Sequence, residues 1–222
     1  MLALVRDGEH DPPVAVREVP EPEPAAHEAL VGVRASSLNR GELALLANRD
    51  DGWRPGQDVA GVVTRPAADG SGPPTGARVA GLVEGAAWAE RVAVPTARLA
   101  ELPDGVDFER ASTLGIAGLT ALRIVRLGGS VVLSGATVGE PARVALFDFV
   151  GHEGARIVPF LSYASGTEED IGADLATLAG LVGDGDLETT VGLVVDWREP
   201  EHAIEALREG DVEGKAVLVV GG

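Results

Sequence analysis

The second half of the chain alternates strands with helices, yet none of its strands is followed by a G-x-G-x-x-G turn. In open α/β folds, that turn lets the pyrophosphate of a dinucleotide sit on the N-terminus of a helix. The pattern of the first half runs on to residue 122, and a strand begins directly after Gly129. The chain therefore lacks the sequence motif that usually binds a dinucleotide.

Composition narrows the class of protein. The 222 residues are 45% hydrophobic, enough for one large core or two small ones. Thirty-five acidic residues against 18 basic ones give a net charge of -17, which repels nucleic acid and anionic membranes. There is no Cys, so disulfides and thiolate metal ligands are excluded, and the first residues lack the apolar run of a signal peptide. We expect a cytoplasmic protein that binds neither nucleic acid nor membrane.

Short β-branched runs separated by clusters of Pro, Gly and Asp fill the first hundred residues. This spacing is typical of an antiparallel, barrel-like domain. The six predicted strands cover residues 1–6, 14–19, 29–35, 59–64, 77–83 and 87–94.

The pattern changes after Asp107, a candidate N-cap for a helix that starts at Phe108. Residues 114–125 then have the apolar periodicity of a buried helix. From there on, strands and helices alternate as in α/β proteins, although the strands are few. Strands are predicted over residues 130–134, 156–160, 191–195 and 215–220, and helices over residues 144–150, 168–182 and 199–209.

Seven short motifs stand in order along nearly the whole chain: residues 18–22 (EVPEP), 35–39 (ASSLN), 55–63 (PGQDVAGVV), 76–79 (GARV), 88–90 (WAE), 118–122 (GLTAL) and 214–218 (GKAVL). In this order they resemble the medium-chain dehydrogenase/reductase superfamily, in its zinc-free quinone oxidoreductase and enoyl reductase branch. The resemblance implies a mixed β and α/β fold. Residues 1–122 and 191–222 would form a GroES-like β-barrel, and residues 123–190 a truncated, Rossmann-like α/β remnant. About a hundred residues of the family's Rossmann domain, the size of a small domain, are then absent.

Two runs within the remnant bear on assembly. Residues 129–135 are similar to the family's late Rossmann strand, and residues 157–163 to the strand that often pairs two subunits. With the central strands absent, both runs would expose an edge, and an exposed edge invites pairing with a second copy. We expect a homodimer.

Asn39 is the strongest candidate for chemistry. In similar reductases this Asn lies near the nicotinamide and the substrate carbonyl, where its amide could donate a hydrogen bond to developing negative charge. Alternatively, Asn39 caps a short helix over residues 41–47, and the two roles are compatible. Gln57 and Asp58 follow a turn at Gly56. Asp58 is a candidate general base or a residue that orients Gln57, whereas a turn or a salt bridge is the structural alternative.

The resemblance also assigns residues to the cofactor side of the cleft. Thr120, Ser134 and Gly135 correspond to cofactor contacts, and Phe160 and Leu161 to residues that flank the nicotinamide. For Thr120 and Leu161, plain packing is the simpler interpretation. Without sites for the phosphates and the adenosine, most of the ligand's binding surface is lost. We therefore expect no cofactor with normal affinity, although the full-length family uses NADPH.

Metal chemistry is disfavoured by the same comparison of motifs. In the zinc-dependent branch, the position of Asn39 belongs to a Cys-containing motif and residues 56–58 to a Gly-His-Glu motif, and both metal ligands are absent here. The four His residues are far apart in sequence and lack the short spacings of zinc ligands. We expect no catalytic metal.

Three hypotheses for function remain. The first is a cofactor-free enzyme that keeps the reductase substrate cleft and catalyses cyclisation, isomerisation or addition on a small molecule. Continuity around the gap supports it, because residues 119–129 could run as a helix, a Gly stop and a strand. The second is an engineered deletion or a remnant of an NADPH-dependent quinone or enoyl oxidoreductase, acting as a substrate-binding or dimerisation module. The third is a non-catalytic interaction protein built on the barrel.

Overall fold

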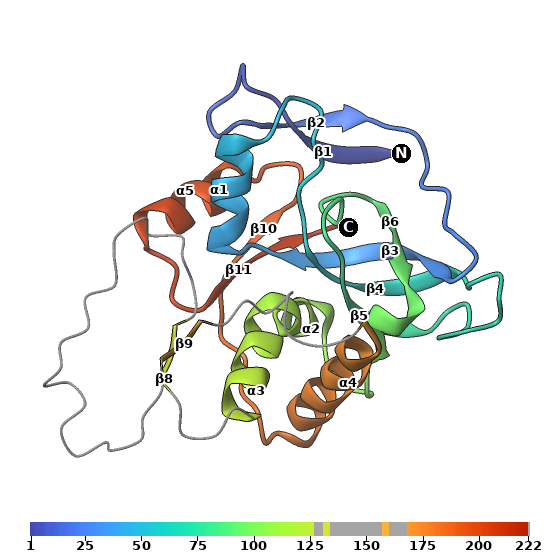
Figure 1. The fold of residues 1–222 in the computed structure, drawn as a ribbon. Coiled ribbons are helices and arrows are strands. Elements are labelled where there is room, and N and C mark those ends of the chain that lie inside the picture. Colours follow the sequence, from blue (N-terminus) through green and yellow to red (C-terminus); the bar gives the residue numbers. More distant parts are fainter. Residues whose placement is uncertain (127–130, 134–156, 160–167, 222) are drawn as a thin grey trace, which may run out of the picture.

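The structure is a computed structural model, and it describes residues 1–126, 131–133, 157–159 and 168–221. The elements are β1 (Leu2–Arg6), β2 (Val14–Glu18), β3 (Glu28–Ser37), α1 (Arg40–Asn48), β4 (Asp58–Arg65), β5 (Arg78–Leu82), β6 (Arg91–Pro95), η1 (Thr96–Arg98), β7 (Leu99–Glu101), α2 (Phe108–Ser112), η2 (Leu114–Gly118), α3 (Leu119–Arg126), β8 (Val131–Leu133), β9 (Ile157–Pro159), α4 (Glu168–Asp184), β10 (Val191–Asp196), α5 (Glu201–Glu209) and β11 (Lys215–Val219). Figure 1 shows α1 and α5 next to each other, and α2, α3 and α4 grouped at another part of the sheet.

A mixed sheet of seven strands organises the fold, with β3 at its centre. One edge of β3 pairs with β4 over residues 30–35. The other edge is shared, because β6 pairs with residues 28–32 and β11 with residues 35–37. β10 extends the sheet beyond β11 as a parallel neighbour, and β5 and β7 extend it beyond β4. Through β3, the sheet joins segments from both ends of the sequence.

The burial pattern of β3 explains how the strand is used. Ala29, Val31 and Val33 are at most 3% exposed and the residues between them are half-buried, so one face of the strand fills the core. At the C-terminal end this alternation stops, and both Ser36 and Ser37 are fully buried. Buried hydroxyl groups require polar partners. A polar cluster is therefore built at this end of β3.

Two apolar cores hold the sheet and the helices together. The first contains Trp88 and Trp197, which are 1% and 0% exposed, with Leu46 of α1 and Ile204 of α5 in the same cluster. Full burial of a large apolar side chain contributes about 1.5–3 kcal/mol. Helices α1 and α5 are thus fixed on the same core, next to the end of β3 where the candidate site lies.

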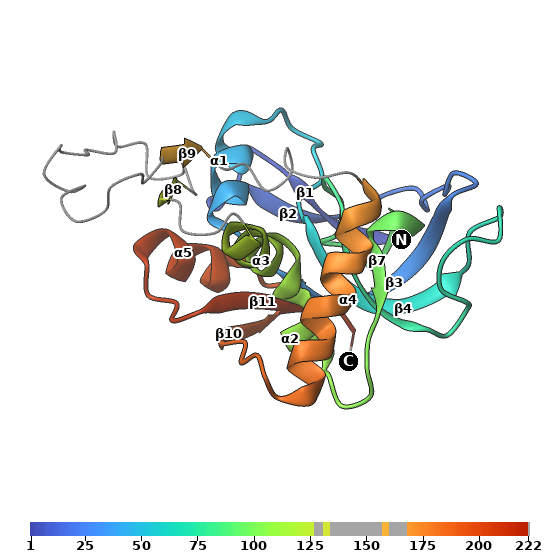
Figure 2. The same cartoon turned by 60° about the horizontal axis from the view of Figure 1, so that its bottom comes forward.

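The second core lies between the sheet and α4. Leu175, Leu178, Ala179 and Val182 recur at helical spacing, are at most 4% exposed and pack with residues of β4, β5 and β7. Figure 2 shows α4 running beside β7. Helix α4 therefore packs against the N-terminal sheet as well as against α3, and the predicted division of the chain at residues 122 and 191 remains a prediction.

A buried ion pair joins α3 to α4. Arg123 Nε lies 3.0 Å from Asp174 Oδ2, and the two residues are 8% and 3% exposed. No helix of the described segments has the length and apolar character needed to cross a bilayer.

Most predicted strands and helices are confirmed, and the differences have local causes. The strand expected over residues 87–94 begins at Arg91, because the N–H groups of Ala87 and Trp88 donate to the carbonyls of Gly56 and Pro55 instead. The barrel-like sheet expected to be antiparallel contains one parallel pair, β10 with β11. Strand β7 was not expected, and the helix expected over residues 144–150 lies outside the described residues.

The helix predicted over residues 114–125 starts with a π turn, η2, before it continues as α3. Within that turn the N–H of Ile116 donates to Asp58 Oδ1 at 2.7 Å, which takes one donor out of the helical ladder. This irregularity brings the start of the helix into the candidate site.

Candidate active site

Asn39 lies between β3 and α1, at the N-cap position of the helix. Its side chain is bonded at both ends: Nδ2 donates to Asp58 Oδ2 at 2.8 Å, and Oδ1 accepts from Lys215 Nζ at 2.6 Å. Asn39 is 9% exposed, and the Lys215 side chain is 16% exposed. The predicted position of Asn39 as a helix cap is confirmed. Its amide nitrogen, however, donates to a carboxylate. Of Asn39 and Lys215, Lys215 has the more exposed side chain.

Asp58 begins β4 and is fully buried. Its carboxylate accepts from Ser37 Oγ at 2.6 Å and from the N–H of Ile116, and it lies 3.6 Å from Lys215 Nζ. Its backbone carbonyl accepts from Ser36 Oγ at 2.5 Å. These contacts pair the buried charge and are those of a positioning residue. A role of Asp58 as general base stays a prediction.

Glu42 is the second buried carboxyl of this cluster and is also fully buried. Its two oxygens accept the N–H groups of Asn39 and Gln57, each at 2.8 Å, so it ties the first turn of α1 to the turn before β4. Burial raises the pKa of Glu42 to about 8, and the negative charge of Asp58 adds to the rise. The two N–H donors and the charge of Lys215 oppose it. A carboxyl group perturbed in this way is a functional-site candidate.

Gln57 contributes its backbone to this arrangement. Its N–H binds Glu42, and its carbonyl accepts from the N–H of Val83 at 2.9 Å. The preceding Gly56 has φ of 104°, and a Cβ there would strike the backbone N of Trp88. Only Gly fits such a position. The turn predicted at Gly56 is thus a close approach of two backbones.

Lys215 is the residue that reasoning from the sequence missed. It is the only Lys of the chain, since the other 17 of the 18 basic residues are Arg. It lies within the 214–218 motif, at the start of β11, and places its charge against a carboxylate of β4. Lys215 could have been singled out from the sequence, because it is the only Lys among the basic residues and lies within one of the family-like motifs.

The predicted cofactor-side residues are placed only in part. Thr120 is half-buried on α3, four residues beyond Ile116. Ser134, Gly135, Phe160 and Leu161 lie outside the described residues. Their assignment to a cofactor stays a prediction. In the part of the chain that the structure describes, no group of three or more His, Asp or Glu side chains is arranged to hold a metal ion.

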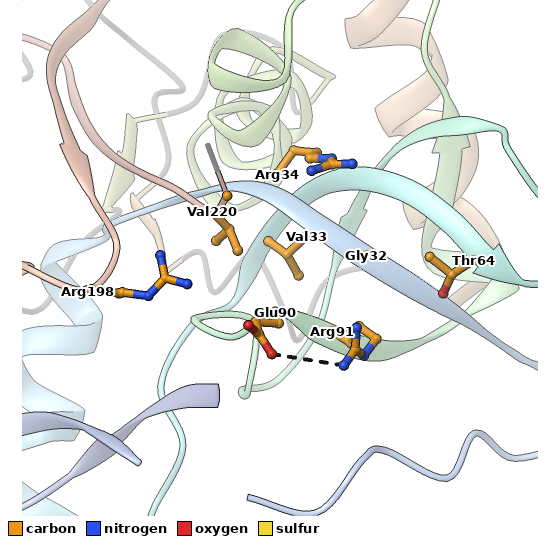
Figure 3. A pocket seen from close by; sticks show the side chains of 9 residues that line it. Gly32, Val33, Arg34, Thr64, Glu90, Arg91, Arg198 and Val220 are labelled. Carbon is orange, nitrogen blue, oxygen red and sulfur yellow. Dashed lines mark ion pairs between the residues drawn. The ribbon is translucent and has the colours of Figure 1, made fainter. Parts of the chain in front are cut away.

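Two cavities are lined by other residues than this cluster. One, of about 260 Å³, lies where β3, β6 and the end of β11 meet and is shown in Figure 3. The other, of about 540 Å³, lies beside residues 20–23. Neither has Asn39, Asp58 or Lys215 in its wall. We place the candidate chemistry at the polar cluster because it holds the buried charges, and not at the cavities.

No family model and no curated protein matches this sequence. Solved structures resemble the fold. Human synaptic vesicle membrane protein VAT-1 homolog-like protein is 18% identical, with a TM-score of 0.83, and the match covers 100% of this chain and 98% of that chain. The quinone oxidoreductase from Coxiella burnetii is 18% identical, with a TM-score of 0.73, and the match covers 100% of this chain and 99% of that chain. A mycobacterial protein in complex with NADPH is 16% identical, with a TM-score of 0.79 over 99% of each chain.

Proposed function

We propose that this chain, which has the fold of the medium-chain dehydrogenase/reductases, is an enzyme that acts on a small carbonyl compound without a bound dinucleotide. The observation that carries the proposal is the contact of Lys215 with Asn39 and Asp58. It supplies a cation at a partly open position, oriented by a neutral amide and paired with one buried carboxylate.

Lys215 is the electrophilic group in this proposal. An ammonium has three donors, and Asn39 Oδ1 takes one of them. Another can bind the carbonyl oxygen of a substrate, where it stabilises the negative charge that develops as solvent water or hydroxide takes a proton from the carbon next to the carbonyl, or as a nucleophile adds to the carbonyl carbon. Enolisation of this kind serves isomerisation, cyclisation and addition alike.

Asn39 and Asp58 act as positioning residues. The carboxylate of Asp58 lies 3.6 Å from Lys215 Nζ and pairs with the ammonium, which helps to fix its position. Asn39 bridges the two and holds the ammonium in place at 2.6 Å. Preorganised charge of this kind needs no rearrangement when the substrate becomes negative, which is the main advantage of an enzyme site over water.

Proton exchange next to a carbonyl tests the proposal directly. We would follow exchange of the ring protons of 2-cyclohexen-1-one in D2O by NMR, with the wild type and with Lys215→Met and Asn39→Ala. Lys215→Met should abolish the protein-dependent rate, and Asn39→Ala should lower it about 10–100-fold, as for the loss of a group that orients a catalytic one. Arg40→Met, an exposed change at the same end of α1, is the control. A rate unchanged by Lys215→Met would rule the proposal out.

A reductase remnant that still binds NADPH is the second candidate, favoured by the structural likeness to a protein in complex with NADPH. Calorimetry with NADPH and NADH up to about 1 mM separates the two, because a Kd in the micromolar range corresponds to about -8 kcal/mol and requires a built site. Such binding would favour the remnant. No heat at about 1 mM would favour the cofactor-free enzyme.

We also propose a homodimer. Among the described residues, strands β8 and β9 pair only with each other, in parallel, and a pair of strands needs further pairing to be stable. Light scattering after size-exclusion chromatography should give twice the chain mass of 22.7 kDa. A mass of one chain at all concentrations would contradict it.

A further inference from the structure

The edge of β3 changes its partner strand at Val33 and Arg34. Before this point β3 pairs with β6, and after it with β11. At the change, the N–H of Val33 donates to the carbonyl of Glu90 at 3.0 Å, and the carbonyl of Arg34 accepts from the N–H of Val220 at 2.8 Å. The two partner strands separate here, and a cavity of about 260 Å³ lies at the point of separation (Figure 3).

Basic side chains outnumber acidic ones in the wall of this cavity, whereas acidic residues outnumber basic ones in the whole sequence. The chain has 35 acidic and 18 basic residues. In the wall, Arg34, Arg91 and Arg198 stand against a single carboxyl, Glu90. Figure 3 shows Arg34 and Arg198 on opposite sides of Val220, with Glu90 and Arg91 across from them. The surface of a strongly acidic protein repels anions, but three guanidinium groups at one cavity can attract an anion there.

The three guanidinium groups are not equally compensated. Arg91 binds Glu21 through two parallel bonds, at 2.7 and 2.6 Å, and lies 4.0 Å from Glu90. Arg198 stacks on Trp197 at 5.1 Å from the ring centre and lies 3.9 Å from Asp196, a distance that gives weak pairing.

Arg34 forms no ion pair with any residue that the structure describes. It is therefore the guanidinium whose charge is left for a ligand. The fork of Arg91 on Glu21 shows that this edge of the sheet already presents a guanidinium to a carboxylate in the bidentate geometry typical of Arg.

We propose that this cavity is a binding site for a small oxyanion, held chiefly by Arg34 and supported by Arg198. Known ligand pockets measure about 300–1,000 Å³, so a cavity of about 260 Å³ limits the ligand to a few atoms around its charged group. A carboxylate and a phosphate both match the planar fork of Arg. Val33 and Val220 add apolar surface between the charged side chains, which suits a short carbon chain. The site is separate from the polar cluster at Asn39.

The test is calorimetric titration of the full chain with two probes, inorganic phosphate and succinate, at low ionic strength. We expect a Kd below about 1 mM for at least one probe, and a loss of at least about tenfold in Arg34→Gln. Arg198→Gln should weaken binding less. Arg65→Gln is the matched control, because Arg65 is also an exposed Arg, on β4 and outside the wall of this cavity. Thermal unfolding of each variant checks that it is folded.

Each outcome decides the matter. Succinate binding that is lost in Arg34→Gln assigns a carboxylate ligand, and phosphate binding with the same loss assigns a phosphate. Binding that falls equally in Arg34→Gln and Arg65→Gln is a general charge effect and overturns the proposal. So does the absence of heat with both probes up to about 10 mM. If Arg34→Gln does not fold, Arg198→Gln against Arg65→Gln carries the same comparison.

Discussion

Lys215 Nζ lies 2.6 Å from Asn39 Oδ1, so the first residue of β11 is bonded to the N-cap residue of α1. The two residues are separated by 176 positions in the sequence. Both also contact Asp58, the first residue of β4. Three elements from different parts of the chain thus meet at one polar cluster. The cluster is both a candidate active site and a clamp on the fold, and its two roles can be tested separately.

Replacing Lys215 by Met should lower the free energy of unfolding by about 3 kcal/mol, because Asp58 would remain buried without its cation. Met keeps most of the apolar stem, so loss of packing adds little. Urea unfolding at neutral pH measures the change. Arg65→Met, an exposed change on β4, should stay within about 0.5 kcal/mol of the wild type. Equal stability of Lys215→Met and the wild type would show that the contact does not hold the fold.

Glu42 should make the protein less stable as the pH rises. The pKa of this carboxyl is about 8 in the folded chain and 4.5 as its ordinary value. Between these values the folded state holds a proton that the unfolded state has released, so the contribution of Glu42 is fully present below pH 4.5 and is lost as the pH rises through about 8. Unfolding free energies from pH 5 to 9 should therefore fall more steeply in the wild type than in Glu42→Gln. Parallel pH profiles would contradict this.

Gly115→Ala should destabilise the fold by about 1–3 kcal/mol, the usual cost of overpacking. A Cβ at Gly115 would strike Asp58 Oδ1 and force the carboxylate away from its partners. Gly180→Ala is the matched control, because it is also helical and its Cβ would meet nothing within 4 Å. That control should stabilise the protein by about 0.5–1 kcal/mol. Chemical unfolding of both variants makes the comparison, and a neutral Gly115→Ala would mean that Asp58 is free to move.

Arg123→Met should cost about 3 kcal/mol, because Asp174 is 3% exposed and would lose the guanidinium 3.0 Å away. The double variant Arg123→Met with Asp174→Leu should recover part of this loss, since an apolar pair leaves no buried charge. Urea unfolding of the single and double variants checks both statements. If the loss of unfolding free energy in the double variant equals the sum of the losses in the two single variants, the two side chains are not coupled.

The sequence was a good guide to the strands and a poorer guide to the site. Short β-branched runs predict β3 and β4, and along β3 buried residues alternate with half-buried ones as that pattern implies. The same rule fails at residues 87–90, where the backbone of Trp88 is bonded to the turn before β4. Local pattern does not carry such a contact, which depends on a Gly with φ of 104° thirty-two positions earlier.

Asn39 was predicted as a site residue through the family resemblance and Asp58 from its place after the turn at Gly56, and the structure brings them together. Their partner Lys215 was not, because pairing between the start of α1 and β11 is decided by the register of the sheet. Glu42 was not predicted as a site residue. Its pKa depends on complete burial, which periodicity over a nine-residue helix does not reveal.

Because β3 lies between β4 and β11, its pairing is complete only after β11 has been synthesised. Lys215, the first residue of β11, is synthesised 176 residues after Asn39, and the partners of residues 35–37 follow it directly. At about 5–20 residues per second, this takes roughly 10–35 s. Throughout that interval, the nascent chain holds an open strand edge and a carboxylate without its cation. We expect nascent chains to stay sensitive to proteases until β11 has left the ribosome, so the last strand of the sheet closes the fold and completes the site in one step.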